Sequence, residues 1–450
     1  MNINKLFFKY CVYYPVVMVR TKGFFKILRE MNKSQYLIPK SLSDLQMKKF
    51  SILFNKIRIR NPIYTELFKN ININDIRSVD DLSKLPFVDK ELVKTRYNDF
   101  LTKQIPLFCT KKTTGGSTGQ AVSILKSRKA MAYELAATWR GYSWANIDIG
   151  DKQARFWGVP FTGKKTIMPR LIDFICNRIR LSAFSFNNES LKFYHRKLLS
   201  FKPVYFYGYL SMMEEYAKYY DTNNISKLKN LKAIISTSEV LHNTKRDFLK
   251  KTFKTNVFNE YGCGEIGSIA HECEYGNMHI SAENMIIEIV NGNKNCDKGE
   301  VGEIVVTELN NDVFPLVRYK IGDFASFANR TCPCGRTLPI IDKIKGRAYD
   351  IVTTKDGKKF HGEFFMYIFE EVERMKYGVN KFQVEQKSLN EIVIKIVPTS
   401  SYKAKETETM IKKYVNSHLG KQISLTFETV DDISREKSGK MRLIIGMNKR

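Results

Sequence analysis

The feature that most constrains the fold is an alternation of strand and helix patterns between residues 204 and 239. Val204–Tyr209 predicts an aromatic strand, Leu210–Tyr220 a helix, and Leu231–Glu239 a buried strand that ends in polar groups. Strand, helix and strand in this order are typical of a parallel sheet with covering helices. Ligands bind such sheets at the carboxyl ends of the strands, where residues 236–239 would lie. We therefore expect an α/β fold with its functional site at that edge.

A chain of 450 residues is longer than one hydrophobic core supports, so we expect more than one domain. Short strands and glycine turns begin around Gly299–Thr307 and predict a β-rich subdomain. Beyond residue 350 the pattern predicts a compact α+β unit, with helices over 363–374 and 404–419 and strands over 391–397 and 423–428. The expected organisation is a large N-terminal domain (1–346, with a basic helical segment at 1–80), a hinge (347–350) and a small mobile C-terminal domain (351–450).

The net charge is +28, and a strongly positive net charge is typical of nucleic-acid-binding proteins. The lysines are scattered, however, and no nucleic-acid-binding motif accompanies them, so we expect no nucleic-acid partner. The excess is greatest in residues 1–60, where 13 Lys or Arg stand against 2 Asp or Glu and alternate with apolar groups. Two interpretations remain open: helices packed on the main domain with lysines in solvent, or peripheral contact with an anionic membrane.

The apolar stretch Cys11–Val19 is too short to span a bilayer, and no signal-peptide cleavage site follows it. We therefore expect a cytoplasmic protein, with peripheral contact at the inner membrane face as the alternative.

A run of glycine and hydroxyl residues, Thr113–Gln120, is the most informative local motif. Glycine permits positive φ and close backbone approach, so successive N–H groups can converge on an anion, and the hydroxyls add donors. The run lacks the lysine of a Walker A loop. It predicts a phosphate-binding loop, and a polar turn between two strands is the alternative.

Four further motifs follow in order: Asn259–Glu265, Arg318–Asp323, Gly346–Asp350 and Arg435–Lys440. In this order and spacing they resemble the motifs of adenylate-forming enzymes, the superfamily of acyl-CoA synthetases, luciferases and peptide-synthetase adenylation domains. The chain looks most similar to the phenylacetate-CoA ligase branch, especially its capsular-polysaccharide-biosynthesis homologues. The resemblance runs from about residue 85 to the C-terminus. It implies a large N-terminal adenylate-forming domain and a small C-terminal lid.

The resemblance also implies an activity: ATP-dependent activation of a small-molecule carboxylate as acyl-AMP, with pyrophosphate release, followed by acyl transfer to a thiol such as CoA. Transfer to an amine or hydroxyl of a sugar-linked acceptor remains open. The alternative is a non-catalytic nucleotide-binding scaffold of polysaccharide assembly at the membrane. Retention of Glu265, Asp323 and Lys440 argues against that alternative.

Adenylation requires a held triphosphate, a neutralising metal and a carboxylate in line with the α-phosphate. The loop suits the first task through Thr113, Thr114, Gly115, Gly116, Ser117, Thr118 and Gly119, with Thr114 placed among the catalytic residues. By resemblance, Glu265 coordinates magnesium, although a carboxylate at a helix N-terminus is the alternative. Lys440 would bridge carboxylate and phosphate oxygens during adenylation.

The resemblance further assigns residues to the nucleotide. Tyr261 would lie against the adenine, with Ser238 and Glu239 beside the same base. Asp323 would accept both ribose hydroxyls, and an ordinary Gly-Asp turn is its alternative. The remaining positions are Glu260 and Gly262 in the nucleotide site, Arg347 on ribose or phosphate, and Asp350 at the hinge.

Cys332 and Cys334, with Cys273 and a histidine, predict a tetrahedral structural zinc site. His271 and His279 compete for the fourth position, and we favour Cys273, His279, Cys332 and Cys334, because a turn after Cys273 lets both groups return to one metal. Buried free thiols in a reducing compartment are the alternative.

The acid itself is not identified by the sequence. We expect its pocket around Trp157–Pro160, Tyr207–Tyr209 and Ser236–Thr237, where aromatic side chains would suit an aryl acid.

Overall fold

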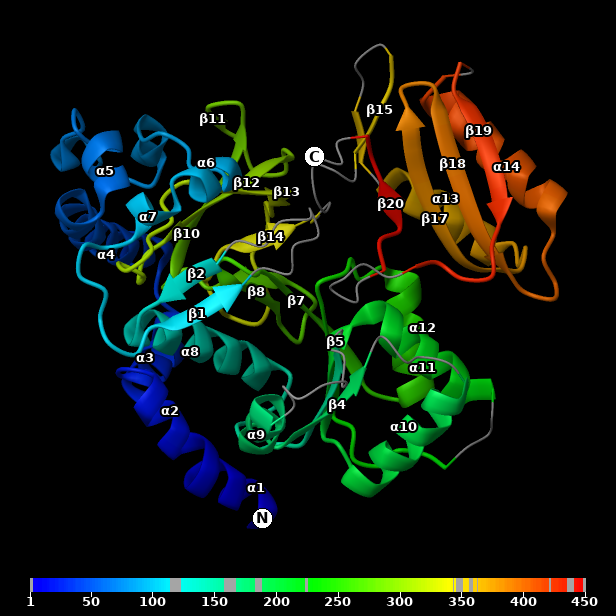
Figure 1. The fold of residues 1–450 in the computed structure, drawn as a ribbon, viewed down its shortest axis with the longest axis horizontal. Helices are drawn as coiled ribbons and strands as arrows, with labels where there is room; N and C mark the ends of the chain where they lie inside the picture. The colour runs from blue at the N-terminus through cyan, green and yellow to red at the C-terminus, as the bar shows by residue number, and fades with distance from the viewer. Residues whose placement is uncertain are drawn as a thin grey trace. The chain divides into compact units, whose positions relative to one another are not determined.

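The computed structural model describes residues 3–113, 123–157, 167–182, 188–222, 226–342, 344, 351–355, 359–361, 363–420, 422–434 and 441–447. The chain divides into two compact units, one formed mainly by residues up to 343 and the other mainly by residues 344–450 (Figure 1). Within the described residues, no helix has both the length and the apolarity that crossing a membrane requires.

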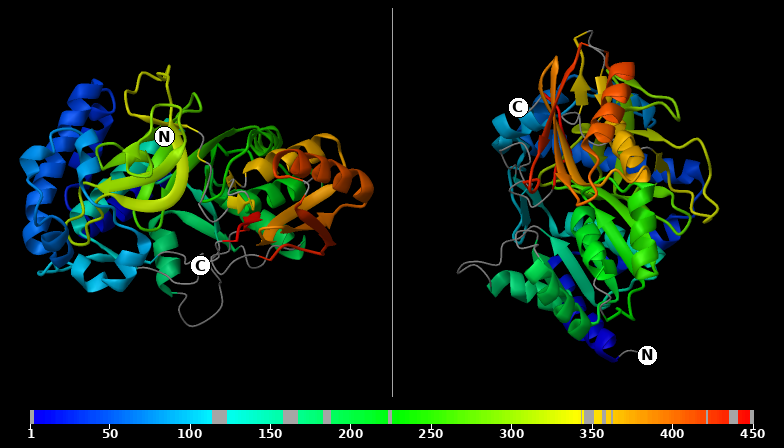
Figure 2. Two further views of the ribbon diagram at one scale, coloured as in Figure 1. Left: turned by 90° about the horizontal axis from the view of Figure 1, so that it is seen from above. Right: turned by 90° about the vertical axis from the view of Figure 1, so that its right-hand side faces the viewer.

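The larger unit begins with helices. They are α1 (Ile3–Leu6), the π-helix η1 (Phe7–Tyr13), α2 (Tyr14–Arg20), α3 (Phe24–Ser34), α4 (Pro39–Arg60), α5 (Pro62–Leu67), the short 3-10 helices η2 (Ile73–Asp75) and η3 (Asp80–Lys84), α6 (Lys90–Thr95) and α7 (Tyr97–Phe100). Helix α4 begins with Pro39 in its first turn, where a proline costs no hydrogen bond, and buries Phe50, Phe54 and Ile57 on one side. Its Gln46 side chain donates to the carbonyl oxygens of Ala282 and Met285, which attaches the helix to the sheet. In the left view of Figure 2, the blue N-terminal helices lie beside the yellow-green strands.

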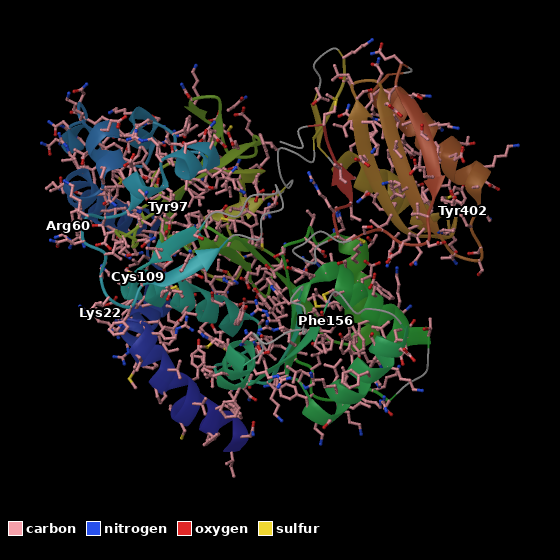
Figure 3. All side chains as sticks on the ribbon, viewed as in Figure 1. Lys22, Arg60, Tyr97, Cys109, Phe156 and Tyr402 are labelled. Carbon is pink, nitrogen blue, oxygen red and sulfur yellow. The ribbon has the colours of Figure 1, made fainter. Side chains whose placement is uncertain are left out.

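Five strands of a 12-stranded sheet form its parallel part: β3 (Gln153–Trp157), β4 (Arg178–Ser182), β5 (Tyr205–Tyr209), β6 (Ala233–Thr237) and β7 (Asn256–Cys263). Helices α10 (Asn188–Phe201), α11 (Leu210–Thr222) and α12 (Asn243–Phe253) cover one face over a core that includes Phe156 (Figure 3). Helix α8 (Arg128–Trp144) contributes Tyr142 to the core on the other face, and α9 (Ile167–Ile175) follows β3. Gly208 is required here, because a Cβ on it would lie 1.9 Å from the Phe156 carbonyl oxygen.

The remaining seven strands of the same sheet are largely antiparallel. It contains β8 (Gly267–Glu272), β9 (Met278–Ile280), β10 (Met285–Asn291), β11 (Lys294–Asn295), β12 (Gly302–Glu308), β13 (Tyr319–Phe327) and β14 (Ile340–Asp342). The strand order is β11-β10-β12-β13-β14-β9-β8-β7-β6-β5-β3-β4. The β-rich region predicted from residue 299 onward thus continues the parallel part through the antiparallel pair β7–β8. A separate hairpin joins β1 (Thr110–Thr113) to β2 (Ser123–Lys126).

Among its described residues, the smaller unit contains a four-stranded sheet, in the order β19-β18-β17-β20, with two helices and a two-stranded ribbon. Its elements are β15 (Ile351–Thr353), β16 (Lys359–His361), α13 (Glu363–Arg374), β17 (Val379–Ser388), β18 (Glu391–Pro398), α14 (Ala404–His418), β19 (Ser424–Thr429) and β20 (Ile444–Ile445). Val372, Ile394 and Ile411 share one buried core. The sequence predicted α13, β18, α14 and β19 but not β17, because its buried residues Gln383, Glu385 and Gln386 are polar.

Candidate functional site

The predicted adenine-binding residues leave the sheet from adjacent strands. Thr237 near the end of β6 lies opposite Glu260 of β7 in a parallel pair. Ser238 follows with a φ of 70°, a left-handed conformation that turns the chain away from the strand. Ser238–Glu239 and Glu260–Gly262 are therefore neighbours at the carboxyl edge of the parallel strands, where ligands bind in such sheets.

In the structure, the Glu239 side chain is bound to the start of helix α11. Its carboxylate accepts hydrogen bonds from the Ser211 backbone N–H at 2.6 Å and from the Ser211 hydroxyl at 2.9 Å. Ser211 lies in the first turn of α11, whose free N–H groups favour a negative charge. Glu239 thus fixes the loop after β6 to the start of α11, and its contact with adenine stays a prediction.

Glu260 is buried beneath this edge. It accepts hydrogen bonds from the Tyr142 hydroxyl at 3.0 Å and the Ser268 hydroxyl at 2.9 Å. Ser268 also lies 2.8 Å from His271 Nε2. Burial raises the pKa of Glu260 and lowers the pKa of His271 to about 3, so this histidine is neutral. Glu260 supports the strand that carries Tyr261 rather than facing solvent.

Glu265, the predicted magnesium ligand, is half-buried in the turn between β7 and β8. No hydrogen bond or ion pair from a described residue occupies its carboxylate. The next residue, Ile266, accepts a hydrogen bond of 3.0 Å from the buried Lys126 ammonium. An acidic side chain with open oxygens on an anchored turn fits the hard-cation chemistry of magnesium.

Lys126 belongs to a buried network that the sequence analysis missed. Its ammonium lies 2.5 Å from the Glu308 carboxylate and 3.8 Å from that of Glu134, which also pairs with Lys112 at 2.5 Å. Although burial opposes it, these carboxylates raise the pKa of Lys126, so it stays charged. The network joins the turn of Glu265 to the β1–β2 hairpin. The sequence feature that could have indicated this network is a lysine, Lys126, as the last residue of the strand Ser123–Lys126.

Several predicted residues lie outside the described part of the chain: Thr114, Gly115, Gly116, Ser117, Thr118, Gly119, Arg347, Asp350 and Lys440. Thr113 ends β1 and pairs with Ser123 at the start of β2, so the glycine and hydroxyl run belongs to the segment that connects two antiparallel strands. Both interpretations of that run, phosphate loop and polar turn, are compatible with this position.

Asp323 is buried on β13. The start of this strand is fixed by the segment around Val88, whose N–H donates to the Arg318 carbonyl oxygen at 3.0 Å and whose own carbonyl accepts from the Lys320 N–H at 2.8 Å. Arg318 is buried and pairs with Glu288 at 3.0 Å. These contacts hold the backbone that leads to Asp323, and its role toward ribose stays a prediction.

Three residues predicted near the acyl pocket lie side by side. The ring of Trp157 stacks on Tyr209 at 4.5 Å and lies 5.9 Å from Tyr207. All three come from the last residues of β3 and β5. The sequence missed their neighbour Arg155, whose guanidinium lies 4.4 Å from the Trp157 ring and 4.9 Å from that of Tyr207.

Arg155 shares its face of the sheet with Arg178 and Arg180 of β4. Asp173 bonds Arg178 at 2.6 Å and Arg180 at 2.8 Å. No described acidic side chain pairs with Arg155, and its buried Nε has no acceptor among the described residues. Burial lowers the pKa of Arg155, because charge is costly there. In the sequence, the arginines on this face could have been found from the alternation of arginine with an apolar residue at 178–180.

A second cluster brings together the four predicted zinc ligands. The ligand atoms of Cys273, His279, Cys332 and Cys334 all lie within 4.8 Å of one another. The Sγ atoms of Cys273 and Cys332 are 3.5 Å apart, and Cys334 Sγ lies 3.3 Å from His279 Nε2. Zn–S bonds of about 2.3 Å at tetrahedral angles place sulfurs about 3.8 Å apart, so the arrangement fits zinc.

The surroundings of this cluster favour metal binding. His279 Nδ1 lies 3.1 Å from the Leu338 carbonyl oxygen, which leaves Nε2 to act as a ligand. Although burial opposes it, hydrogen bonds from Cys334, Cys273 and Asn277 hold the pKa of Cys332 below its ordinary value, which favours a thiolate. Of the two candidate histidines, His279 belongs to the cluster, whereas His271 lies 2.8 Å from the Ser268 hydroxyl.

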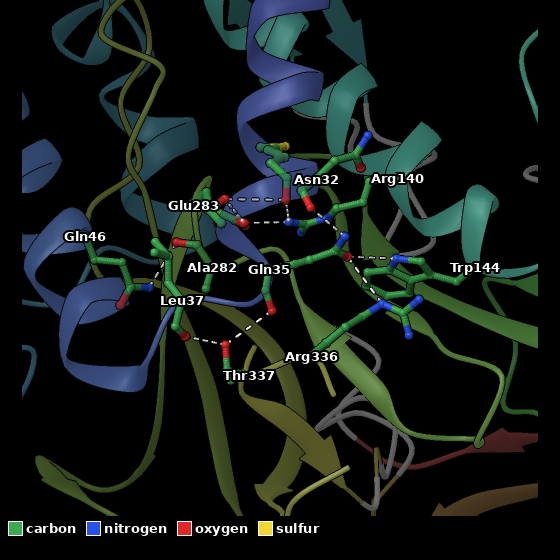
Figure 4. Close-up of polar contacts among 12 residues, drawn as sticks. Asn32, Gln35, Leu37, Gln46, Arg140, Trp144, Ala282, Glu283, Arg336 and Thr337 are labelled. Atoms are coloured by element: carbon green, nitrogen blue, oxygen red, sulfur yellow. Dashed lines mark hydrogen bonds and ion pairs between the residues drawn. The ribbon is translucent and has the colours of Figure 1, made fainter. Parts of the chain in front are cut away.

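The segment after Cys334 is tied to the N-terminal helices (Figure 4). Gln35 Oε1 accepts hydrogen bonds from Trp144 at 3.1 Å and Arg336 at 3.3 Å, and the Thr337 hydroxyl donates to the Gln35 carbonyl oxygen at 3.2 Å. If the cysteine cluster became disordered, these contacts would weaken and the end of α3 would become less stable.

Comparison with known proteins gives three kinds of match. Residues 352–447 match the family model described as the CapK C-terminal domain. The chain is 26% identical over 427 residues to Protein CapK of Staphylococcus aureus, covering 93% of this chain and 91% of that protein. It is 23% identical over 214 residues to phenylacetate-coenzyme A ligase of Thermus thermophilus, covering 42% and 48%.

Among solved structures, 2-hydroxyisobutyryl-CoA ligase in its postadenylation state, bound to R3-HIB-AMP, superposes with a TM-score of 0.74 at 16% identity, covering 92% of this chain and 91% of the ligase. The same ligase with 2-HIB-AMP and CoA, in its thioesterification state, gives a TM-score of 0.57, with 91% of each chain covered. The fold class expected from the sequence is confirmed, and so is the resemblance that the motifs predicted.

Proposed function

We propose that this chain, a homologue of Protein CapK in the adenylate-forming CoA ligase superfamily, activates a carboxylic acid as acyl-AMP and transfers the acyl group to a thiol such as CoA. The observation that carries the proposal is the pairing of β6 and β7, which sets Ser238–Glu239 beside Glu260–Gly262 at the carboxyl edge of a parallel sheet. The solved ligase with this fold binds an acyl-AMP, and also CoA.

In the first half-reaction a carboxylate oxygen attacks the α-phosphorus of ATP and pyrophosphate leaves. The glycine and hydroxyl run would hold the phosphates, Tyr261 the adenine and Asp323 the ribose. Glu265 would hold magnesium, which when bound neutralises charge on the phosphates. Lys440 would approach the reacting oxygens from the C-terminal domain, and rotation about residues 347–350 would remove it before acyl transfer.

Arg155 extends the proposal to the acid. The Arg155 guanidinium lies near the Trp157 and Tyr207 rings, and no described carboxylate forms an ion pair with it, although the buried Glu260 is near enough to interact with its charge. Such a guanidinium would bind an anionic group. We therefore propose an acid with an aromatic or apolar body and a second anionic group. A role in capsular or surface polysaccharide synthesis, with CoA or a sugar-linked acceptor, follows from the relation to CapK and the motif resemblance.

The test is formation of acyl-AMP from MgATP and a pooled library of carboxylic acids, followed by mass spectrometry. The library contains pairs of acids with and without a second anionic group. We expect at least one acyl-AMP and preference for the doubly anionic member, and Arg155→Met should reduce that preference. Binding of ATP without acyl-AMP from any acid would instead favour the non-catalytic scaffold.

Asp323→Ala should weaken ATP binding by about 10- to 100-fold. A charged acceptor contributes about 1.5–3 kcal/mol to a hydrogen bond, and each 1.4 kcal/mol is tenfold in affinity. Calorimetric titration with ATP measures the change, and circular dichroism checks the fold. Asp323→Asn, which keeps one acceptor oxygen, is the matched control and should lose less. If folded Asp323→Ala protein binds ATP with unchanged affinity, Asp323 does not belong to the nucleotide site.

A further inference from the structure

The N-terminal helices α1, η1 and α2 present apolar side chains to solvent. The exposed fractions are 82% for Ile3, 50% for Phe7, 55% for Tyr10, 56% for Met18 and 72% for Val19. Most are three, four or eight residues apart, so they follow one side of a helical segment. A helix on a water-soluble domain ordinarily turns this side toward the core.

The lysines of the same segment point inward. Lys9 pairs with Asp148 at 2.7 Å, and Lys5 pairs with Asp151 at 3.0 Å. Both lysine side chains are only partly exposed, whereas Tyr13 and Val17 on the same segment pack in a core with α8, as expected for helices packed on the main domain. The Tyr13 hydroxyl accepts a 2.7 Å hydrogen bond from Trp139 of α8. These contacts fix the rotation of the segment and keep its apolar side outward.

Helix α9 continues this surface. The Phe174 ring lies 5.3 Å from that of Phe8, which lies 5.6 Å from that of Phe7 (Figure 1 shows α9 near the N-terminus). Phe174 is 55% exposed, and Met168 and Leu171 on the same helix are 64% and 49% exposed. We call the combined surface the apolar N-terminal face: Ile3, Phe7, Tyr10, Met18, Val19, Met168, Leu171 and Phe174.

Positive charge surrounds this face. Four basic residues of the first 30 are exposed and not used in the inward pairs, namely Arg20, Lys22, Lys26 and Arg29 (Figure 3 labels Lys22). Arg170 on α9 is exposed as well. The first 30 residues contain a single acidic side chain, Glu30. Two copies meeting through this face would bring like charges together, which opposes self-association.

We propose that the apolar N-terminal face docks on the anionic surface of a lipid bilayer, with the helices lying in the plane of the interface. The apolar side chains would enter the boundary between headgroups and acyl chains, and the basic side chains would pair with anionic headgroups. This inference goes beyond the proposed function, because it concerns where the protein works and not which acid it activates.

The test is co-sedimentation of the full chain with vesicles of phosphatidylcholine alone or with about one-third phosphatidylglycerol. We expect binding to the anionic vesicles, weaker binding to the neutral ones, and loss as salt rises, because screening weakens surface charge interactions. The double variant Phe7→Ser/Phe174→Ser should bind on the order of tenfold less tightly, since two large side chains leave the interface. Lys22→Glu/Lys26→Glu should lose the preference for anionic lipid.

Leu107→Ser is the matched control, because Leu107 is 83% exposed and belongs to a different segment. It should bind vesicles like the wild type. Equal sedimentation of the double variant and the wild type would overturn the proposal, and so would absence of binding to anionic vesicles. Self-association that disappears in the double variant, without vesicle binding, would assign the face to a second copy. Acyl-AMP formation in solution, measured on the same variants, keeps this test separate from the proposed function.

Discussion

Lys440→Ala is expected to reduce acyl-AMP formation by about 10²–10³-fold, while ATP binding falls much less. Its ammonium would act on oxygens whose charge develops only as the carboxylate attacks the α-phosphate, so the loss falls on the transition state. Rapid-mixing measurement of acyl-AMP formation under saturating ATP determines the effect. Lys413→Ala, at an exposed lysine of α14 outside the motifs, is the matched control and should keep near wild-type rates.

The second half-reaction separates catalysis from structure. Supplied with preformed acyl-AMP and the acceptor, Lys440→Ala should retain most of its transfer activity, because rotation about residues 347–350 would already have removed the lysine. Equal losses in both half-reactions would mean that Lys440 supports the fold, or that the two domains do not alternate between arrangements.

Cys332→Ala is expected to abolish zinc binding and to destabilise the protein. Wild-type protein prepared without chelators should hold about one zinc per chain, since four N and S ligands complete a structural site. Metal binding at such a site contributes directly to folding free energy, so the variant should lose metal and unfold at a lower temperature. Elemental analysis and thermal unfolding followed by circular dichroism measure the two effects.

Cys109→Ala is the control, because Cys109 lies outside the cluster. It should keep both the metal and the unfolding temperature. The connection from Arg336 and Thr337 to Gln35 predicts that metal loss also loosens α3, which hydrogen exchange would detect as faster exchange in residues 24–34. If wild-type protein contains no zinc, the prediction is wrong and the cysteines are buried free thiols.

The sequence by itself determined the local structure and the order of the motifs. Strand and helix periodicity predicted β5, α11 and β6, and it predicted α13 to the residue, because apolar spacing is a local property. The five ordered motifs, from Thr113–Gln120 to Arg435–Lys440, predicted the superfamily, since their residue types and spacings are read directly from the chain. The expected carboxyl edge of the parallel strands followed from the same patterns.

Only the tertiary structure decided which distant groups meet. His271 and His279 are direct partners on β8 and β9, yet Ser268 engages the first and the cysteine cluster includes the second. Lys126 pairs with Glu308 across 182 residues. Residues 3–20 bury Tyr13 and Val17 but expose Ile3, Phe7 and Tyr10, because Lys5 and Lys9 pair with aspartates far along the chain. Periodicity encodes which residues share a face, but the partner of that face depends on packing between segments that are distant in sequence.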